Sequence, residues 1–438
     1  MTDERRTGTG QSQMRDDPTF LTPRRILTSI GILFSGTTAA RILSLASVVI
    51  VIRTVGPEEF GLYAASLALT KLTSVIFSLG LDDWLLRGGN LKNRGIKIAE
   101  LLSSSLSIQF IVGLLWLGSL GILSQFLDPT VYPLDILLIS GITVWLEELT
   151  QTMWTAFKVT LNNKVTMQLM ILVQTLILGS ALVCMAIGAT TVLPYAIGRA
   201  IGTALGVIIA FIFILRQFGF QLEYRLSVRS LRETLPYAVS MALVLLYERA
   251  DVTIIAWNLG KEAVGFYTPA VSLTLALAMA PAAIYGVILP VASRIFVERP
   301  TDLPSFSRQV LSGNLLLSIT LGIGLALVAR PVALLFYGPD YTATGDVLFV
   351  LSAVLAFRTL SFGLAAFVVA VGLQRQRIWA QAVAALFNIA GNLLTIRSHG
   401  IVGVAVVYCL SEAVLMLGYS MIFIRWLRAA RNRQVTSR

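Results

Sequence analysis

Long apolar stretches recur from residue 27 to residue 427, and they restrict the fold more than any other feature of the chain. A helix needs about 20 apolar residues to cross the hydrocarbon core of a bilayer, and in lipid every backbone polar group must be bonded within the chain. Only 13% of the 438 residues are charged and 56% are hydrophobic, which fits burial in lipid. The sequence therefore predicts an all-α polytopic membrane protein of about twelve transmembrane helices. The expected spans are 27–53, 61–81, 99–125, 134–157, 165–188, 191–215, 234–258, 264–292, 311–336, 344–372, 377–397 and 401–427.

The placement of basic residues between these spans predicts the orientation. Of the 34 lysines and arginines, 25 fall in loops and tails on the side of the N-terminus and only 4 on the opposite side. Cytoplasmic loops carry the excess of basic residues in membrane proteins. We therefore expect a plasma (inner) membrane protein with both termini in the cytoplasm. The formal net charge of +11 then faces anionic lipid, so the lipid bilayer is the expected partner and nucleic acid is not.

Two short segments of the chain repeat each other. Residues 55–63 (VGPEEFGLY) align without a gap with residues 259–267 (LGKEAVGFY), at an offset of 204 residues. Each segment joins an odd-numbered span to the next one, which predicts two parallel repeats of six helices. The shared glycines suit a tight turn, and the shared tyrosines, Tyr63 and Tyr267, are expected in the headgroup belt. The alternative is a common turn with no direct role in transport.

The repeat sets the expected domain organisation. A disordered, basic cytoplasmic tail covers 1–26 and a basic cytoplasmic linker covers 218–233. The N-terminal six-helix bundle is expected over 27–217 and the C-terminal six-helix bundle over 234–428, followed by a basic tail at 429–438.

Several motifs, in a fixed order along the chain, resemble those of a known transporter family. They are Arg41 followed by RTVGPEEFGLY at 53–63, LPY at 235–237 leading to Asp251, LPVASR at 289–294, LFYGPDY at 335–341 and GIVGVA at 400–405. In these the chain resembles the polysaccharide-transporter branch, the O-antigen-type lipid-linked oligosaccharide flippases, of the multidrug/oligosaccharidyl-lipid/polysaccharide (MOP) exporter superfamily.

The resemblance implies two MATE-like bundles in a V around a central cavity, lined largely by spans 1, 2, 7 and 8. It also implies a function: translocation of polyprenyl-pyrophosphate-linked glycan by alternating access, for cell-surface polysaccharide biosynthesis such as lipopolysaccharide O-antigen export. The partners that it implies are the polyprenyl-pyrophosphate-linked glycan and, as candidates, glycan polymerase and glycosyltransferases.

Ten charged residues lie inside the expected spans, away from the span ends. A charge at the bilayer centre costs at least ~2.5 kcal/mol, so each should face the cavity or a partner. Four of the cations are candidates for a midplane ring that binds the pyrophosphate through charge-assisted hydrogen bonds. These substrate-binding candidates are Arg41, Lys71, Arg249 and Arg358. The alternative is pairing with intramembrane carboxylates, which applies above all to Lys71, Arg199 and Arg358; the carboxylates are Glu147, Glu148, Glu248, Asp251 and Glu412.

Asp251 is the candidate for ion coupling. It shares a helical stripe with Ser240, Tyr247 and Asn258, and a carboxylate among such groups could take up H⁺ or Na⁺. A buried aspartate that fixes the packing of its span is the alternative. No other cofactor is expected, and no catalytic or metal-binding residue.

Two other functions fit the same class of sequence. A membrane enzyme of glycan assembly, a polymerase or ligase, usually carries a large outer loop with catalytic groups, whereas every outer loop here is short. A MATE-like ion-coupled drug exporter shares the architecture, but an excess of midplane cations suits anionic cargo and repels cationic drugs. We therefore do not expect an enzyme, and the exporter is kept as the main alternative.

Overall fold

The computed structural model describes residues 23–86, 98–160, 162–218 and 228–436, and all regular structure in these ranges is helical. Residues 1–22 of the expected disordered tail at 1–26 lie outside them, as does most of the expected linker at 218–233; residues 23–26 of that tail are not disordered but belong to the first helix. The helices are α2 (Pro23–Thr73), α3 (Val75–Ser78), α4 (Leu81–Leu86), α5 (Ile98–Leu123), α6 (Leu134–Val159), α7 (Asn163–Ala186), α8 (Val192–Gln217), α9 (Val228–Leu259), α10 (Lys261–Leu277), α11 (Met279–Glu298), α12 (Leu303–Tyr337), α13 (Thr342–Ala370) and α14 (Gln374–Thr436). Short 3₁₀ turns lie at Ser124–Phe126, Pro300–Asp302 and Pro339–Tyr341.

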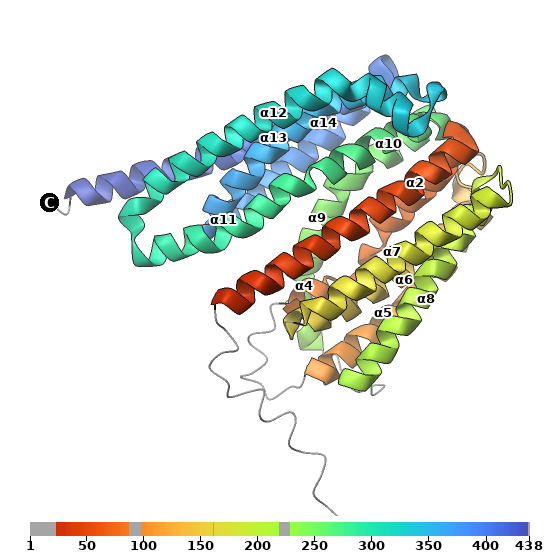
Figure 1. The fold of residues 1–438 in the computed structure, drawn as a ribbon, viewed down its shortest axis with the longest axis horizontal. Coiled ribbons are helices and arrows are strands. Elements are labelled where there is room, and N and C mark those ends of the chain that lie inside the picture. Colours follow the sequence, from red (N-terminus) through yellow and green to blue (C-terminus); the bar gives the residue numbers. More distant parts are fainter. Residues whose placement is uncertain (1–22, 87–97, 161, 219–227, 437–438) are drawn as a thin grey trace, which may run out of the picture.

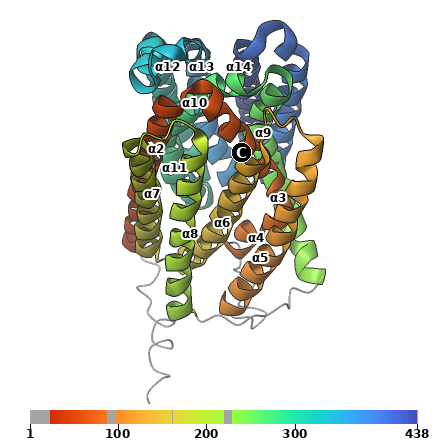
Figure 2. The same cartoon turned by 90° about the vertical axis from the view of Figure 1, so that its right-hand side faces the viewer.

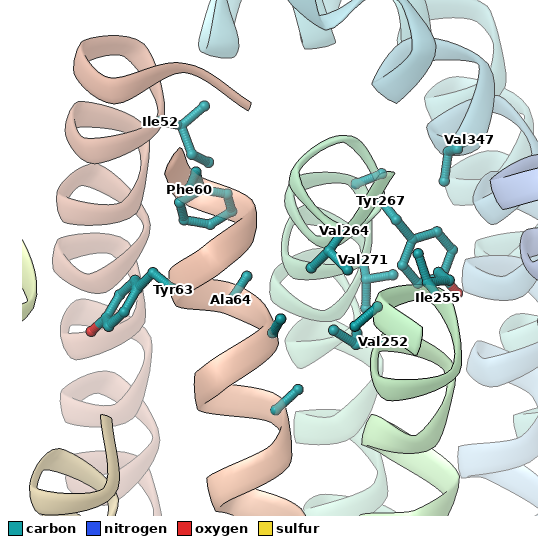
Figure 3. Packing of buried hydrophobic residues seen from close by; sticks show 14 of the residues in the cluster. Ile52, Phe60, Tyr63, Ala64, Val252, Ile255, Val264, Tyr267, Val271 and Val347 are labelled. Carbon is teal, nitrogen blue, oxygen red and sulfur yellow. The ribbon is translucent and has the colours of Figure 1, made fainter. Parts of the chain in front are cut away.

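The two longest helices each turn back on themselves at a glycine. Gly56 in α2 and Gly400 in α14 have positive φ angles of 80° and 56°, which glycine adopts without steric cost. In α14 the residues on either side of Gly400 then pack in pairs: Gly391 lies against Val407, and Gly418 against Ala380. The two halves of α14 therefore run antiparallel, and Figure 3 shows the same reversal in α2, between Ile52 and Phe60.

The second span of each repeat is interrupted at the same relative position. α2 gives way to α3 at Ser74, and α10 gives way to α11 at Ala278, again 204 residues apart. Pro281 accounts for the second break, since its ring clashes with the carbonyl four residues earlier and it donates no hydrogen bond there. At the first break the hydroxyls of Thr73 and Ser74 bond to backbone carbonyls of the preceding turn, which bends helices. The spans expected at 61–81 and 264–292 are thus each divided in two.

Eight helical stretches of the described chain are long and apolar enough to cross a membrane. Two of them, Ser35–Ser78 and Gln374–Ala429, contain the glycine reversals. α6 and α9 are not among the eight; they contain several charged residues each, which lower their mean hydropathy. The all-helical, multi-pass membrane fold is therefore confirmed, whereas the count of twelve crossings stays a prediction.

The helices form two groups that follow the repeat. Figures 1 and 2 place α2 and α4–α8 on one side of the molecule and α11–α14 on the other, with α9 and α10 between them. Each group has its own buried apolar cluster, built around Trp116 and Phe157 in the first and around Phe367 and Phe423 in the second. A third cluster, which contains Ile52 and Ile255, joins the groups. We call the first group the N-terminal bundle and the second, with α9 and α10, the C-terminal bundle.

The two repeat segments contact each other across the boundary between the bundles. Gly61 lies directly against the carbonyl of Lys261, and Gly265 lies against the carbonyl of Pro57, so that a β-carbon on either glycine would overlap backbone. Gly61 corresponds to Gly265 and Pro57 to Lys261 under the 204-residue offset. The two contacts are therefore equivalent, as expected for a pseudo-twofold interface. The Lys261 ammonium also pairs with Glu58 at 2.8 Å. We call this region the repeat-turn end of the molecule.

More polar contacts tie the bundles together at the repeat-turn end. The Arg53 guanidinium donates to the carbonyl of Phe336 at 2.9 Å and to that of Leu335. Tyr341 donates its hydroxyl proton to the carbonyl of Ile52 at 3.4 Å. Tyr63 and Tyr267 are only 6% and 0% exposed and are buried among helices, so, in contrast to the sequence expectation, neither ring is presented to lipid head groups. Each lies seven residues, about two helical turns, beyond the positive-φ glycine of its turn, Gly56 or Gly260.

Helix boundaries refine the expected segments between and after the bundles. α9 begins at Val228, so residues 228–233 of the expected linker already belong to a helix. α14 continues to Thr436, so the expected basic tail at 429–438 is in its described part an extension of the last helix. The domain boundaries themselves stay a prediction.

Candidate functional site

Two cavities meet at the boundary between the bundles. The N-terminal chamber, about 490 Å³, lies within the N-terminal bundle and is closed on one side by α9. The C-terminal chamber, about 410 Å³, lies among α9, α10, α11, α13 and α14. Arg41 of α2 and Val244 of α9 line both chambers, so these residues mark the junction.

The N-terminal chamber has two ion pairs on its wall, and both use α6. Glu148 pairs with Lys71 of α2, and its side chain is 3% exposed. Glu147 pairs with Arg199 of α8 at 2.8 Å. Successive residues on a helix point about 100° apart, so neighbouring glutamates reach different helices. Lys71 and Arg199 thus pair with intramembrane carboxylates, as the alternative interpretation predicts. The two ion pairs connect α6 to α2 and to α8.

A third ion pair lies on the wall of the C-terminal chamber. Arg358 of α13 bonds to Glu412 of α14 at 3.1 Å, with side chains that are 13% and 1% exposed. A buried carboxylate with an arginine beside it is compensated only while both members are present. Arg358 is therefore also placed as one member of a structural pair.

Arg41 and Arg249 differ from the other candidates. Neither forms an ion pair with any residue of the described chain, and both line the C-terminal chamber. Arg41 is exposed to the cavity, whereas Arg249 is half-buried. Glu248 lines the same chamber as the two arginines and partly offsets their charge. Three of the four cations of the expected ring, Arg41, Arg249 and Arg358, thus line the C-terminal chamber, although Arg358 is paired there with Glu412. The fourth, Lys71, is paired on the wall of the N-terminal chamber.

Asp251 lies away from both chambers. It is 2% exposed; one carboxylate oxygen accepts the hydroxyl proton of Tyr267 at 2.7 Å and the other accepts the backbone N–H of Val252 at 2.8 Å. The bond to Tyr267 joins α9 to α10. Of the residues on its expected stripe, Asn258 bonds instead to the carbonyl of Ile254. The packing alternative matches this geometry, and a role in ion coupling stays a prediction.

Sequence reasoning missed part of the chamber walls. Trp154 and Gln174 line the N-terminal chamber, and Arg377 lines the C-terminal one. A signal for Trp154 was present: it follows Glu147 by seven residues, about two helical turns, which places both on one face of α6.

Comparison with known proteins decides the family. Residues 26–296, more than half of the chain, match the family described as polysaccharide biosynthesis protein. The chain belongs to the polysaccharide biosynthesis protein family. No curated protein matches this chain.

Solved structures of MOP superfamily transporters share the fold of this polysaccharide biosynthesis protein. A lipid II flippase MurJ in an inward closed conformation matches with a TM-score of 0.70 and 17% identity, over 89% of this chain and 86% of that one. An inward-facing MATE multidrug resistance transporter matches with a TM-score of 0.73 and 14% identity, over 88% and 94%. An outward-facing MATE transporter matches with a TM-score of 0.65 and 15% identity, over 96% and 98%. The expected MATE-like fold is confirmed, and so is the expected polysaccharide family.

Proposed function

We propose that this polysaccharide biosynthesis protein is a flippase that moves polyprenyl-pyrophosphate-linked oligosaccharide across the plasma membrane by alternating access. The observation that carries the proposal is the unpaired couple of Arg41 and Arg249 where the two chambers meet. Two cations that form no ion pair, with one carboxylate, Glu248, on the same wall, leave a positive charge inside a membrane fold, which is costly unless an anion binds there. A transported anionic head group supplies that anion.

A diphosphate fits this couple in charge and in geometry. Guanidinium groups present planar forks of N–H donors that match phosphate oxygens, and such charge-assisted bonds are about twice as strong as neutral ones. The two arginines line the same chamber from different bundles, Arg41 from α2 and Arg249 from α9, so a diphosphate in this chamber has guanidinium groups on both sides of the boundary. The apolar wall of the C-terminal chamber, with Leu243, Leu275 and Met279, accommodates the first part of a polyprenyl chain.

Alternating access follows from the two bundles and their contact at the repeat-turn end. Two repeats around a shared site can rock against each other, and here one end is held by a small set of backbone and ion-pair contacts. The charge distribution of the loops supports an orientation with both termini in the cytoplasm and the repeat-turn end outside. Export toward the outer leaflet then requires this end to open. Transport of this kind needs no covalent step on the cargo, so we propose no enzymatic activity.

The decisive test is a double substitution at the junction. We expect Arg41→Ala with Arg249→Ala to lower the transport rate of polyprenyl-diphosphate oligosaccharide in liposomes about tenfold or more, because each charged hydrogen bond to phosphate is worth ~1.5–3 kcal/mol. Arg308→Ala, an exposed arginine on α12 that lines neither chamber, is the matched control and should transport normally.

The same experiment separates the flippase from the drug exporter. In a MATE-like exporter of cationic compounds, removal of two cavity cations would leave export of an organic cation unchanged or increase it. Normal flipping of lipid-linked oligosaccharide by the double variant would exclude the proposed site.

For ion coupling we propose Asp251 as the group that exchanges H⁺ or Na⁺ during the cycle. In support, it is a buried carboxylate in the helix that also carries Arg249. We expect Asp251→Asn to transport without dependence on the ion gradient, whereas Tyr267→Phe, which removes only the hydrogen-bond donor, should keep that dependence. Transport rates in liposomes with and without a proton or sodium gradient measure the difference. If transport by the Asp251→Asn protein still depends on the ion gradient, Asp251 has only a packing role.

A further inference from the structure

The second span continues differently in the two repeats after its break. In the C-terminal bundle α11 is one helix from Met279 to Glu298. Under the 204-residue offset, residues 279–290 of this helix correspond to residues 75–86, which form the two short helices α3 and α4. Between α3 and α4 lies a corner made by Leu79 and Gly80. The chain thus contains the same element of the repeat in two forms, one continuous and one bent.

The α3–α4 corner holds an unfavourable backbone conformation. Leu79 has a φ angle of 50° and Gly80 one of 66°, and Leu79 is the one residue other than glycine with a positive φ in the described chain. This conformation is disfavoured for a residue with a β-carbon and persists only where the surroundings stabilise it. A continuous helix over these residues, as in α11, would avoid the strain. Contacts outside the segment must therefore stabilise the bent form.

The stabilising contact is made with α9, across the boundary between the bundles. A β-carbon on Gly80 would lie 2.5 Å from the amide nitrogen of Ala238 and 2.6 Å from the carbonyl carbon of Tyr237, so the corner touches the backbone of α9. The hydroxyl of Ser78 lies 3.5 Å from the sulfur of Met241. Ser78 and Ala238 are only 3% and 8% exposed, so the two elements exclude water here. Figures 1 and 2 show α3 and α4 beside α9.

The corner lies beyond the two arginines, at the end of the molecule opposite the repeat-turn end. At about 1.5 Å per helical residue, Gly80 is roughly 35 Å from the turn at Gly56, whereas Arg41 is roughly 22 Å from it. Ser78, Gly80 and Met241 also line the N-terminal chamber. The bundles are thus in contact at both ends, and the corner forms the wall of the chamber at the end opposite the repeat turns.

We propose that the α3–α4 corner is a gate, which closes the N-terminal chamber by its contact with α9 and opens by straightening into a continuous helix like α11. Strain at Leu79 favours opening as soon as α9 moves away, so part of the energy for opening is stored in the closed gate. Because α11 has no such corner, the gate belongs to one bundle alone. Under the orientation given with the proposed function, on which this clause rests, the gate faces the cytoplasm.

Two neighbouring substitutions should move this gate in opposite directions. Gly80→Ala adds a β-carbon that overlaps the backbone of α9 and disfavours the positive φ, so it favours the open form. Leu79→Gly removes the strain of the bent form and weakens the straight helix, so it favours the closed form.

The measurement is the rate at which a hydrophilic maleimide labels a cysteine placed at Ser78, in the purified full-length protein with Cys184 and Cys409 replaced by alanine. Ser78 is buried in the closed gate, so labelling requires opening. We expect labelling about fivefold faster or more with Gly80→Ala, and about fivefold slower with Leu79→Gly.

Gly286→Ala is the matched control, because Gly286 belongs to α11 and an added β-carbon there meets no other group within 4 Å. It should label at the unsubstituted rate. A change in the same direction at Leu79 and Gly80, or no change at either, would overturn the gate. If Gly80→Ala does not fold, Leu79→Gly decides alone, and labelling that is not slowed overturns the gate. Labelling needs neither cargo nor transport, so these outcomes leave the proposed function to the test at Arg41 and Arg249.

Discussion

Valine at both Gly61 and Gly265 should abolish transport. Each glycine lies directly against a carbonyl of the other bundle, and any β-carbon there overlaps that backbone. Overpacking of this kind costs about 1–3 kcal/mol per site. For two sites the conformation seen here loses at least about 2 kcal/mol, a change of roughly thirtyfold in its population. Because a transporter that works by alternating access must return to this conformation in every cycle, the cycle stops.

The measurements for this prediction are the transport rate and the distance between spin labels placed on the two bundles at the repeat-turn end. We expect the labels to move apart in the double glycine variant. Gly179→Val with Gly313→Val is the matched control, since neither of these helical glycines has another group within 4 Å of an added β-carbon. Normal transport by the Gly61 and Gly265 variant would show that this contact does not have to re-form during the cycle.

Removal of the Arg358 charge should destabilise the protein severely. Arg358→Met leaves Glu412 as a buried carboxylate without its cation, and the loss of one partner of a buried pair costs about 3–5 kcal/mol. The double variant Arg358→Met with Glu412→Leu should recover the stability, because no charge is left uncompensated. Thermal unfolding of the purified variants measures both effects.

An exposed pair in the same bundle provides the control for this cycle. Arg330 bonds to Asp346 at 2.8 Å, but their side chains are 76% and 47% exposed, and such surface pairs contribute about 0–1 kcal/mol. Arg330→Met should therefore unfold nearly as the wild type does. If the double variant is stable and transports normally, Arg358 does not bind cargo. If it is stable but does not transport, Arg358 belongs to the cargo-binding cations.

The repeat explains why so much of the fold could be predicted from the sequence. Apolar length and charge placement indicate helices that cross lipid, and a nine-residue match at one offset predicts two related bundles. In the structure the same 204-residue offset also relates the helix breaks at Ser74 and Ala278 and the contacts of Gly61 and Gly265. Periodicity along a helix is a local property, so it can be read without the tertiary structure.

The site was less predictable, because its chemistry depends on contacts between distant segments. Lys71 and Glu148 are 77 residues apart, and nothing in either local sequence indicates which cation reaches which carboxylate. Arg53 precedes a turn, where the sequence shows only a loop charge, yet its guanidinium bonds to carbonyls at the end of α12. Among the four cations proposed to bind cargo, Arg41 and Arg249 are the two that form no ion pair in the described chain, and the sequence does not indicate this.

The position of Arg41 and Arg249 on separate bundles has a mechanical consequence. Like charges on the two sides of one chamber repel each other, so this repulsion acts between α2 and α9. Under the proposed function, a bound diphosphate would attract both arginines and draw the two helices together. Cargo binding and release would then each change the force between the bundles.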